Sequence, residues 1–423
     1  MAAVTTADLD LSRFIRSGDQ LLWSHACGEP STLIERLIEQ RARLGGVGAF
    51  AATSFSQALK PEFADHIRFS SMGAMGSLRV LAKARVLAVV PCHFGQIPGL
   101  IETGALPCDV AFVQVSPADS HGRHSFGVVN DFMQAMVARA RVVIAEVNDQ
   151  VPFTRCDQYL PAGRIDARIE TSRPLVEIQP AVISPEEAAI ARIAAGYVED
   201  GSVLQVGIGA VPDAITQLLG DRRNLGVHSG MIGDGIVELM LAGAITNATK
   251  PFDVGVSVTG SLMGSRRLFD FAHDNPGLLM RASSYTHSDA VLCQIPKMIT
   301  INSALEVDLT GQVNSEQTGD AYVGGTGGQI DYVRAGSRSR GGHSLIALPS
   351  TAGGGRFSRI VAHLTGPVST ARSEVDIIIT EYGAAELKGR SIADRAKRLV
   401  AIAHPQFREG LERDAAALAA RGF

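Results

Sequence analysis

Two glycines, Gly207 and Gly209, are separated by Ile208, a spacing that could form an anion-binding loop. They stand between a strand-like run and a helix-like run, where missing side chains let backbone N–H groups approach an anion at a helix N-terminus. The third glycine of a dinucleotide-binding fingerprint is missing, since Asp213 and Ala214 follow the proline after the motif. The motif therefore fits either an anion-binding loop or a plain tight turn.

A denser glycine tract occupies residues 324–328 and includes Gly325, Gly327 and Gly328. Such a loop can present several N–H groups to an oxyanion or a phosphate. Three basic residues follow it: Arg334, Arg338 and Arg340. This cluster could face the phosphates of a large anionic cofactor. A flexible turn followed by a solvated charged face is the competing interpretation.

One carboxylate, Glu306, stands between the apolar residues Leu305 and Val307. Burial there would raise the pKa of the carboxyl or demand a hydrogen-bonding partner. An isolated acid of this kind is a candidate nucleophile or general base, and a structural carboxylate that braces a loop is an equal alternative. No two histidines have metal-ligand spacing, and no Gly-x-Ser-x-Gly elbow joins a strand to a helix, so the sequence predicts neither a metal site nor a serine hydrolase.

Short, continuous apolar runs alternate with helical patterns along the chain, which predicts an α/β fold whose strands are buried on both faces. The strand-like runs cover residues 86–90, 110–115, 142–147, 203–206, 298–301, 344–348 and 375–380. Helices are predicted over residues 185–198 and 212–219. Each begins with proline and carries an acid in its first turn, where the helix dipole favours negative charge.

An internal similarity suggests two domains of the same kind in tandem. Residues 18–30 and residues 201–212 both have the pattern of a strand, a glycine loop and a proline that leads into a helix. We therefore predict two open-sheet domains, residues 1–184 and residues 185–423, joined near residues 183–186.

The composition limits the classes of partner. The 423 residues are 46% hydrophobic and 19% charged with a net charge of −4, and no basic face predicts binding to nucleic acid. The five cysteines form no CxxC pair, which argues against a disulfide framework or a zinc site and favours a reducing compartment. No signal peptide and no apolar run of ~18 residues is visible, so we expect a cytoplasmic protein without a membrane partner.

Several stretches, in order along nearly the whole chain, resemble the acetyl-CoA hydrolase/transferase family, which includes the class I-type 4-hydroxybutyrate and acetate CoA-transferases. In the first half they are residues 114–122, 125–127 and 143–150. In the second half they are residues 207–214, 302–314, 327–332, 380–383, 387–390 and 402–408.

The resemblance implies two CoA-transferase-like domains, with the CoA site carried by the C-terminal one. It implies an acyl-CoA and a small carboxylate as substrates, no permanently bound cofactor, and a homo-oligomer such as a dimer. The CoA- and oxyanion-binding residues would be Gly207, Ile208, Gly209, Gly325, Gly327, Gly328 and Arg334. We expect both glycine loops to line one cleft, beyond the carboxyl ends of the strands.

Members of the family transfer CoA through a glutamate, which forms an acyl anhydride and then a glutamyl-CoA thioester. The resemblance places this glutamate at Gly230, in the stretch that runs from Val227 to Gly235. Glycine cannot form the thioester. A CoA-transferase that uses another carboxylate, Glu306 or Asp234, is our first hypothesis. The alternatives are an acyl-CoA hydrolase, in which water enters the gap at Gly230, and a non-catalytic acyl-CoA-binding protein or an enzyme for another acyl transfer.

Overall fold

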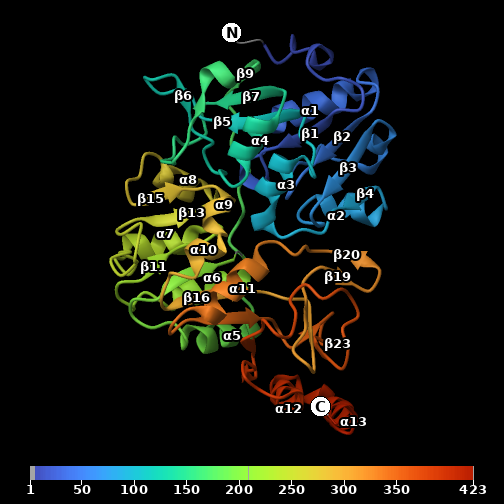
Figure 1. Ribbon diagram of the computed structural model, residues 1–423, viewed down its shortest axis with the longest axis vertical. Coiled ribbons are helices and arrows are strands. Elements are labelled where there is room, and N and C mark those ends of the chain that lie inside the picture. The colour runs from blue at the N-terminus through green and yellow to red at the C-terminus, as the bar shows by residue number, and fades with distance from the viewer. Residues whose placement is uncertain (1–4, 208, 423) are drawn as a thin grey trace. The chain divides into compact units, whose positions relative to one another are not determined.

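The computed structural model describes residues 5–207 and 209–422, which form two compact units (Figure 1). The first unit consists of Met1–Gln179, Val258–Thr286 and Ala321–Gly327. The second consists of Pro180–Ser257, His287–Asp320 and Gly328–Phe423. Two segments that the sequence analysis assigned to the second half thus pack within the first unit. Backbone pairing explains this, since Ser261 bridges to Val129 and Gly325 bridges to Gly73.

A seven-stranded parallel sheet forms the centre of the first unit, in the order β4-β3-β2-β1-β5-β7-β9. Its strands are β1 (Gln20–Trp23), β2 (Val47–Phe50), β3 (Ile67–Ser71), β4 (Leu87–Val89), β5 (Val110–Val115), β7 (Val142–Asn148) and β9 (Ala167–Thr171). Its helices are α1 (Ser31–Gln40), α2 (Leu78–Lys83), α3 (Ile97–Thr103), α4 (Met133–Arg139), α8 (Arg266–Ala272) and α9 (Ser283–Thr286). Every residue of β5 is buried, as the continuous apolar run predicts.

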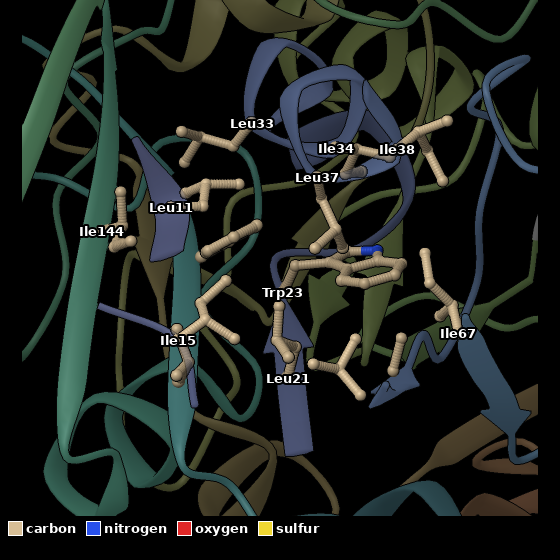
Figure 2. Packing of buried hydrophobic residues seen from close by; sticks show 14 of the residues in the cluster. Leu11, Ile15, Leu21, Trp23, Leu33, Ile34, Leu37, Ile38, Ile67 and Ile144 are labelled. Atoms are coloured by element: carbon tan, nitrogen blue, oxygen red, sulfur yellow. The ribbon is translucent and has the colours of Figure 1, made fainter. Parts of the chain in front are cut away.

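The core of this unit forms between the sheet and α1, whose apolar residues recur at helical spacing (Figure 2). Leu37 points toward the Trp23 indole, Leu33 lies near Leu11, and Ile67 lies beside the indole ring. Trp23 is 1% exposed. Burying so large an aromatic side chain fixes α1 on the sheet.

A polar cluster is buried in the same unit. The Asp131 carboxylate accepts a hydrogen bond from the Ser261 hydroxyl, and its Oδ2 atom lies 3.0 Å from His25 Nε2. The His25 ring stacks on Phe132 with ring centroids 5.1 Å apart. All three polar side chains are at most 2% exposed. Burying a carboxylate is costly without partners, so the hydroxyl and the imidazole stabilise its charge.

A six-stranded sheet forms the centre of the second unit, in the order β11-β10-β16-β21-β25-β26, with only β26 antiparallel among these described strands. The strands are β10 (Val203–Val206), β11 (Gly226–Val227), β16 (Met298–Asn302), β21 (His343–Ala347), β25 (Ile377–Thr380) and β26 (Gly383–Glu386). The helices are α5 (Pro185–Ala195), α6 (Ala210–Gln217), α7 (Asp234–Leu241), α10 (Asp289–Leu292), α11 (Gln329–Arg338), α12 (Ile392–Ile402) and α13 (Pro405–Ala419). The predicted α/β class is thereby confirmed.

The structure contains both of the helices that were predicted to begin with proline. α5 begins at Pro185, and a capping box precedes it: Glu187 N–H donates to Ser184 Oγ at 3.2 Å, and Ser184 N–H donates to the Glu187 carboxylate at 2.8 Å. α6 begins two residues before the predicted position, at Ala210. Proline fits inside its first turn because the N–H groups there need no partner within the helix.

None of the helices built from the described residues combines the length and the apolar character needed to cross a membrane.

Candidate active site

The loop between β10 and α6 lies at the carboxyl end of β10. Gly209 is the N-cap of α6 and has a φ of 117°, a conformation that favours glycine. Gly207 N–H donates to the Ile301 carbonyl at 3.3 Å, which ties the loop to β16. Ile208, also predicted to bind CoA, lies outside the described residues. The first turn of α6 leaves N–H groups without a helical acceptor, so this loop can present donors to an oxyanion.

A cavity of about 180 Å³ opens at this loop and is confined to the second unit. It is lined by Gly209, by Ser303 after β16, by Leu348 after β21, and by Arg359 and Glu187. Ligands of open α/β sheets bind at this edge, beyond the carboxyl ends of the strands. Burial lowers the pKa of the Arg359 guanidinium, which still remains a cation at neutral pH.

Gly230, the position assigned to the family glutamate, lies between β11 and β12 (Met231–Ile232) and is buried. Its φ is not in the left-handed region, so the backbone does not require glycine. The neighbours do. A Cβ atom at this position would lie 2.5 Å from His287 Cε1, 2.7 Å from His287 Nε2 and 3.3 Å from the Tyr332 hydroxyl. An imidazole thus occupies the space that a side chain at residue 230 would enter.

His287 was missed by the sequence analysis, which judged the histidines to be dispersed. Its ring is 7% exposed and lies 4.8 Å from the ring of Tyr332, between centroids. A Cβ at Gly328, the N-cap of α11, would lie 2.5 Å from His287 Nε2. No periodic pattern in the sequence joins these residues, because only the tertiary fold brings Gly230, His287 and Gly328 together.

Asp234, the second carboxylate proposed as a substitute, is the first residue of α7 and follows the N-cap Gly233. Burial raises the pKa of the nearby Asp213 carboxyl, and the negative charge of Asp234 adds to this effect. Asp234 lies where a helix dipole favours negative charge. This placement fits a structural acid, and a catalytic role for Asp234 stays a prediction.

Glu306 begins the short strand β17 (Glu306–Asp308) and is 9% exposed. Its Oε1 atom accepts hydrogen bonds from Asn314 Nδ2 at 2.9 Å, from Thr365 N–H at 2.7 Å and from Gly366 N–H at 3.2 Å. The Thr365 hydroxyl lies 3.0 Å from Oε2. Donors from three other residues hold this carboxylate in place, which favours the bracing role over a free nucleophile.

Replacing Glu306 with alanine is expected to lower the free energy of unfolding by roughly 2–4 kcal/mol, because buried donors would lose their acceptor. Circular dichroism during urea unfolding measures the change. Glu409→Ala, on the exposed face of α13, is the control and should stay within about 0.5 kcal/mol of the parent chain. A Glu306→Ala protein of unchanged stability that has lost all acyl-CoA turnover would instead make Glu306 the nucleophile.

The glycine tract spans the boundary between the two units, since Gly325 and Gly327 belong to the first unit and Gly328 to the second. In the first unit, Ala74 N–H donates to the Gly324 carbonyl and Phe94 N–H donates to the Gly327 carbonyl, both at 2.8 Å. These bonds anchor the tract and argue against a flexible turn. A common cleft with the β10–α6 loop stays a prediction.

Two of the three arginines after the tract share one carboxylate. Glu374 lies 3.2 Å from Arg334 Nε and 4.0 Å from Arg338 Nη2, and Arg338 also pairs with Asp289 at 3.5 Å. Arg340 lines a separate cavity of about 450 Å³, near the amino ends of β10 and β16. Exposed pairs of this kind contribute little to stability and leave the arginines able to exchange partners. The predicted contact of Arg334 with CoA stays a prediction.

Among the described residues, no group of three or more His, Cys, Asp or Glu side chains is placed to hold a metal ion. The five cysteines, all of which lie among the described residues, form no disulfide bond. The chemistry available at the carboxyl edge of the second sheet is therefore that of helix N–H donors, carboxylates, one arginine and the imidazole of His287.

Comparisons with known proteins match both halves of the chain. The model of the acetyl-CoA hydrolase/transferase N-terminal domain matches residues 6–180, and that of the C-terminal domain matches residues 264–415. The chain is 40% identical over 412 residues to the 4-hydroxybutyrate coenzyme A transferase of Clostridium kluyveri, covering 96% of each protein. It is 36% identical to the succinyl-CoA:acetate/propanoyl-CoA:succinate CoA transferase of Fasciola hepatica, covering 95% of this chain and 85% of that one.

Solved structures are also similar to this chain over nearly its whole length. RipA from Yersinia pestis superposes with a TM-score of 0.90 at 33% identity and covers 97% of this chain and 96% of its own. The 4-hydroxybutyrate CoA-transferase from Porphyromonas gingivalis superposes with a TM-score of 0.83 at 33% identity, covering 98% and 97%. These matches confirm the resemblance and the two CoA-transferase-like domains in tandem. The chain belongs to the acetyl-CoA hydrolase/transferase family.

Proposed function

We propose that this enzyme moves CoA between a small acyl-CoA and a carboxylic acid. The observation that carries the proposal is the 40% identity to a CoA-transferase over 96% of both chains. Similarity of this extent covers the sheets and the loops at their carboxyl edges alike. The acyl-CoA thioester and the free carboxylate are substrates, and no permanently bound cofactor forms part of the proposal.

The second unit offers groups suited to this reaction. The N-terminus of α6, with Gly209 as its cap, can stabilise the oxyanion that forms when a thioester carbonyl is attacked. The cavity beside it has the size of a small carboxylate, and Arg359 supplies positive charge to its lining. A guanidinium can bind a carboxylate through two parallel hydrogen bonds. We assign the α6 loop to the thioester and the cavity to the acid.

The missing side chain at Gly230 keeps two alternatives open. An acyl-CoA hydrolase would pass the acyl group to water, and a non-catalytic homologue would bind acyl-CoA without turnover. The test is incubation of the purified full chain with acetyl-, butyryl- or succinyl-CoA, with and without a second carboxylate. Chromatography follows the acyl-CoA species, and a thiol reagent follows free CoA.

We expect a new acyl-CoA to form only when the acceptor carboxylate is present, without release of free CoA. Stoichiometric release of CoA without an acceptor would establish the hydrolase. Binding of acyl-CoA without any turnover would establish the non-catalytic homologue. A homo-oligomer such as a dimer and a cytoplasmic location complete the proposal, and sedimentation analysis and cell fractionation test them.

A further inference from the structure

The space beside Gly230 is not a gap. In a glutamate-bearing enzyme the carboxylate would extend from residue 230, yet here the ring of His287 lies within 2.7 Å of the point where the Cβ atom would be. The side chain that lies beside the position of the family carboxylate is therefore the imidazole of His287, which can itself act as a nucleophile. Water entering a void at Gly230 does not agree with this geometry.

The surroundings of His287 hold its ring in this position. Gly230 and Gly328 both leave room for it, since a Cβ at either residue would lie 2.5 Å from a ring atom. Tyr332 covers the ring at 4.8 Å between centroids, and the two planes are inclined by 57°. All four residues belong to the second unit. The absence of a side chain at both glycines thus gives the buried imidazole its space.

The local field suits nucleophilic chemistry. Gly328 is the N-cap of α11, a helix of 10 residues, and the N–H groups of the first turn can stabilise negative charge that develops on the oxygen of an attacked carbonyl. The neutral ring is the form that attacks a carbonyl carbon, and histidine is an established covalent nucleophile.

We propose that His287 takes the place of the missing carboxylate and accepts the acyl group from CoA during transfer. This inference rests on the proposed function. Nε2 attacks the thioester carbonyl, the C–S bond breaks, and CoA departs as a thiolate while the acyl group stays on the ring as an acylimidazolium. The acceptor carboxylate then attacks the acyl carbon, the C–N bond breaks, and a mixed anhydride forms as neutral imidazole returns.

The CoA thiolate completes the exchange by attacking the acceptor's carbonyl in the anhydride and expelling the first acid as a carboxylate. No proton and no electron is gained or lost overall. An imidazole has no carbonyl with which to hold CoA, so an enzyme-bound CoA thioester does not form. CoA must therefore stay bound until the acceptor arrives, and the kinetics become sequential instead of ping-pong.

The test uses the full chain with isotope-labelled acetyl-CoA, examined during turnover by native mass spectrometry of the intact protein at neutral pH, because acid would hydrolyse an acylimidazole. We expect a transient increase in mass by one acetyl group, and sequential initial-rate patterns. His287→Gln should abolish the adduct and lower turnover on the order of 100-fold or more while CoA still binds. His363→Gln, at an exposed histidine of the same unit, is the matched control and should change neither.

The outcomes separate the two proposals. Transfer that continues in a folded His287→Gln protein would overturn the role of His287 and leave the CoA-transferase intact. An adduct on His287 that passes its acetyl group only to water would support His287 and overturn the transferase. If His287→Gln fails to fold, the adduct and the kinetic pattern of the parent chain decide. A parent chain that turns over with ping-pong kinetics and without an adduct overturns the inference.

Discussion

A chain that carries both Gly230→Glu and His287→Ala is expected to exchange CoA on the order of 100-fold faster than His287→Ala alone, about 2.7 kcal/mol of transition-state stabilisation. The double variant supplies a carboxylate and removes the ring that occupies its place. Gly230→Glu by itself is expected to gain less, because its Cβ would lie 2.5 Å from His287 Cε1 unless the ring turns to another rotamer. Chromatography of the acyl-CoA products measures the exchange, and mass spectrometry should detect CoA attached to the new glutamate.

His287→Ala is the matched baseline, since it opens the same space without adding a carboxylate. If Gly230→Glu alone gained as much as the double variant, the His287 ring would have to move aside readily. If a folded double variant bound acyl-CoA but gained no exchange, the surrounding groups would no longer support carboxylate chemistry. Backbone strain is not the explanation for such a failure, because the φ of Gly230 lies outside the left-handed region.

Removing the buried carboxylate of the first unit is expected to cause the largest loss of stability. Asp131→Ala leaves His25 and the Ser261 hydroxyl without the group that they contact. Leaving two buried polar groups without their acceptor, together with the cavity that the truncation opens, lowers the free energy of unfolding by roughly 3–5 kcal/mol. Trp23 is the one tryptophan of the chain and lies in the core of the same unit, so its fluorescence during urea unfolding measures the change.

Asp270→Ala is the matched control for Asp131→Ala. It breaks a pair with Arg266 in the same unit, in which the aspartate side chain is 62% exposed and the arginine 46% exposed. Because water screens such a pair, its loss should cost no more than about 1 kcal/mol. Equal effects of the two substitutions would mean that the buried cluster contributes no more to stability than an exposed pair.

The sheets could be predicted from sequence because their signal is local. The run at residues 110–115 is apolar without interruption, and β5 is buried along its whole length. Pro185 with its two following glutamates marks the start of α5 for an equally local reason. Family resemblance then added what local patterns cannot supply, namely the hypothesis that glycine at residue 230 stands where the family has a glutamate.

The candidate site could not be predicted to the same depth because its decisive contacts are long-range. Residues 230 and 287 are far apart in the chain, and no local sequence pattern predicts that they lie in contact. Glu306 illustrates the same limit. Its flanking residues predict burial, but the donors from Thr365 and Gly366 that hold the carboxylate come from a distant segment. The ion pairs of Arg334 and Arg338 depend on Glu374 and Asp289 in the same way.

The ring held between two glycines also couples substitutions at residues 230 and 287. A Cβ atom at residue 230 would lie 2.5 Å from His287 Cε1, so a side chain there requires the imidazole to turn to another rotamer. The effect of a substitution at residue 230 therefore depends on which residue stands at position 287. Substitutions at the two positions are expected to be non-additive, and a double-mutant cycle measures their coupling.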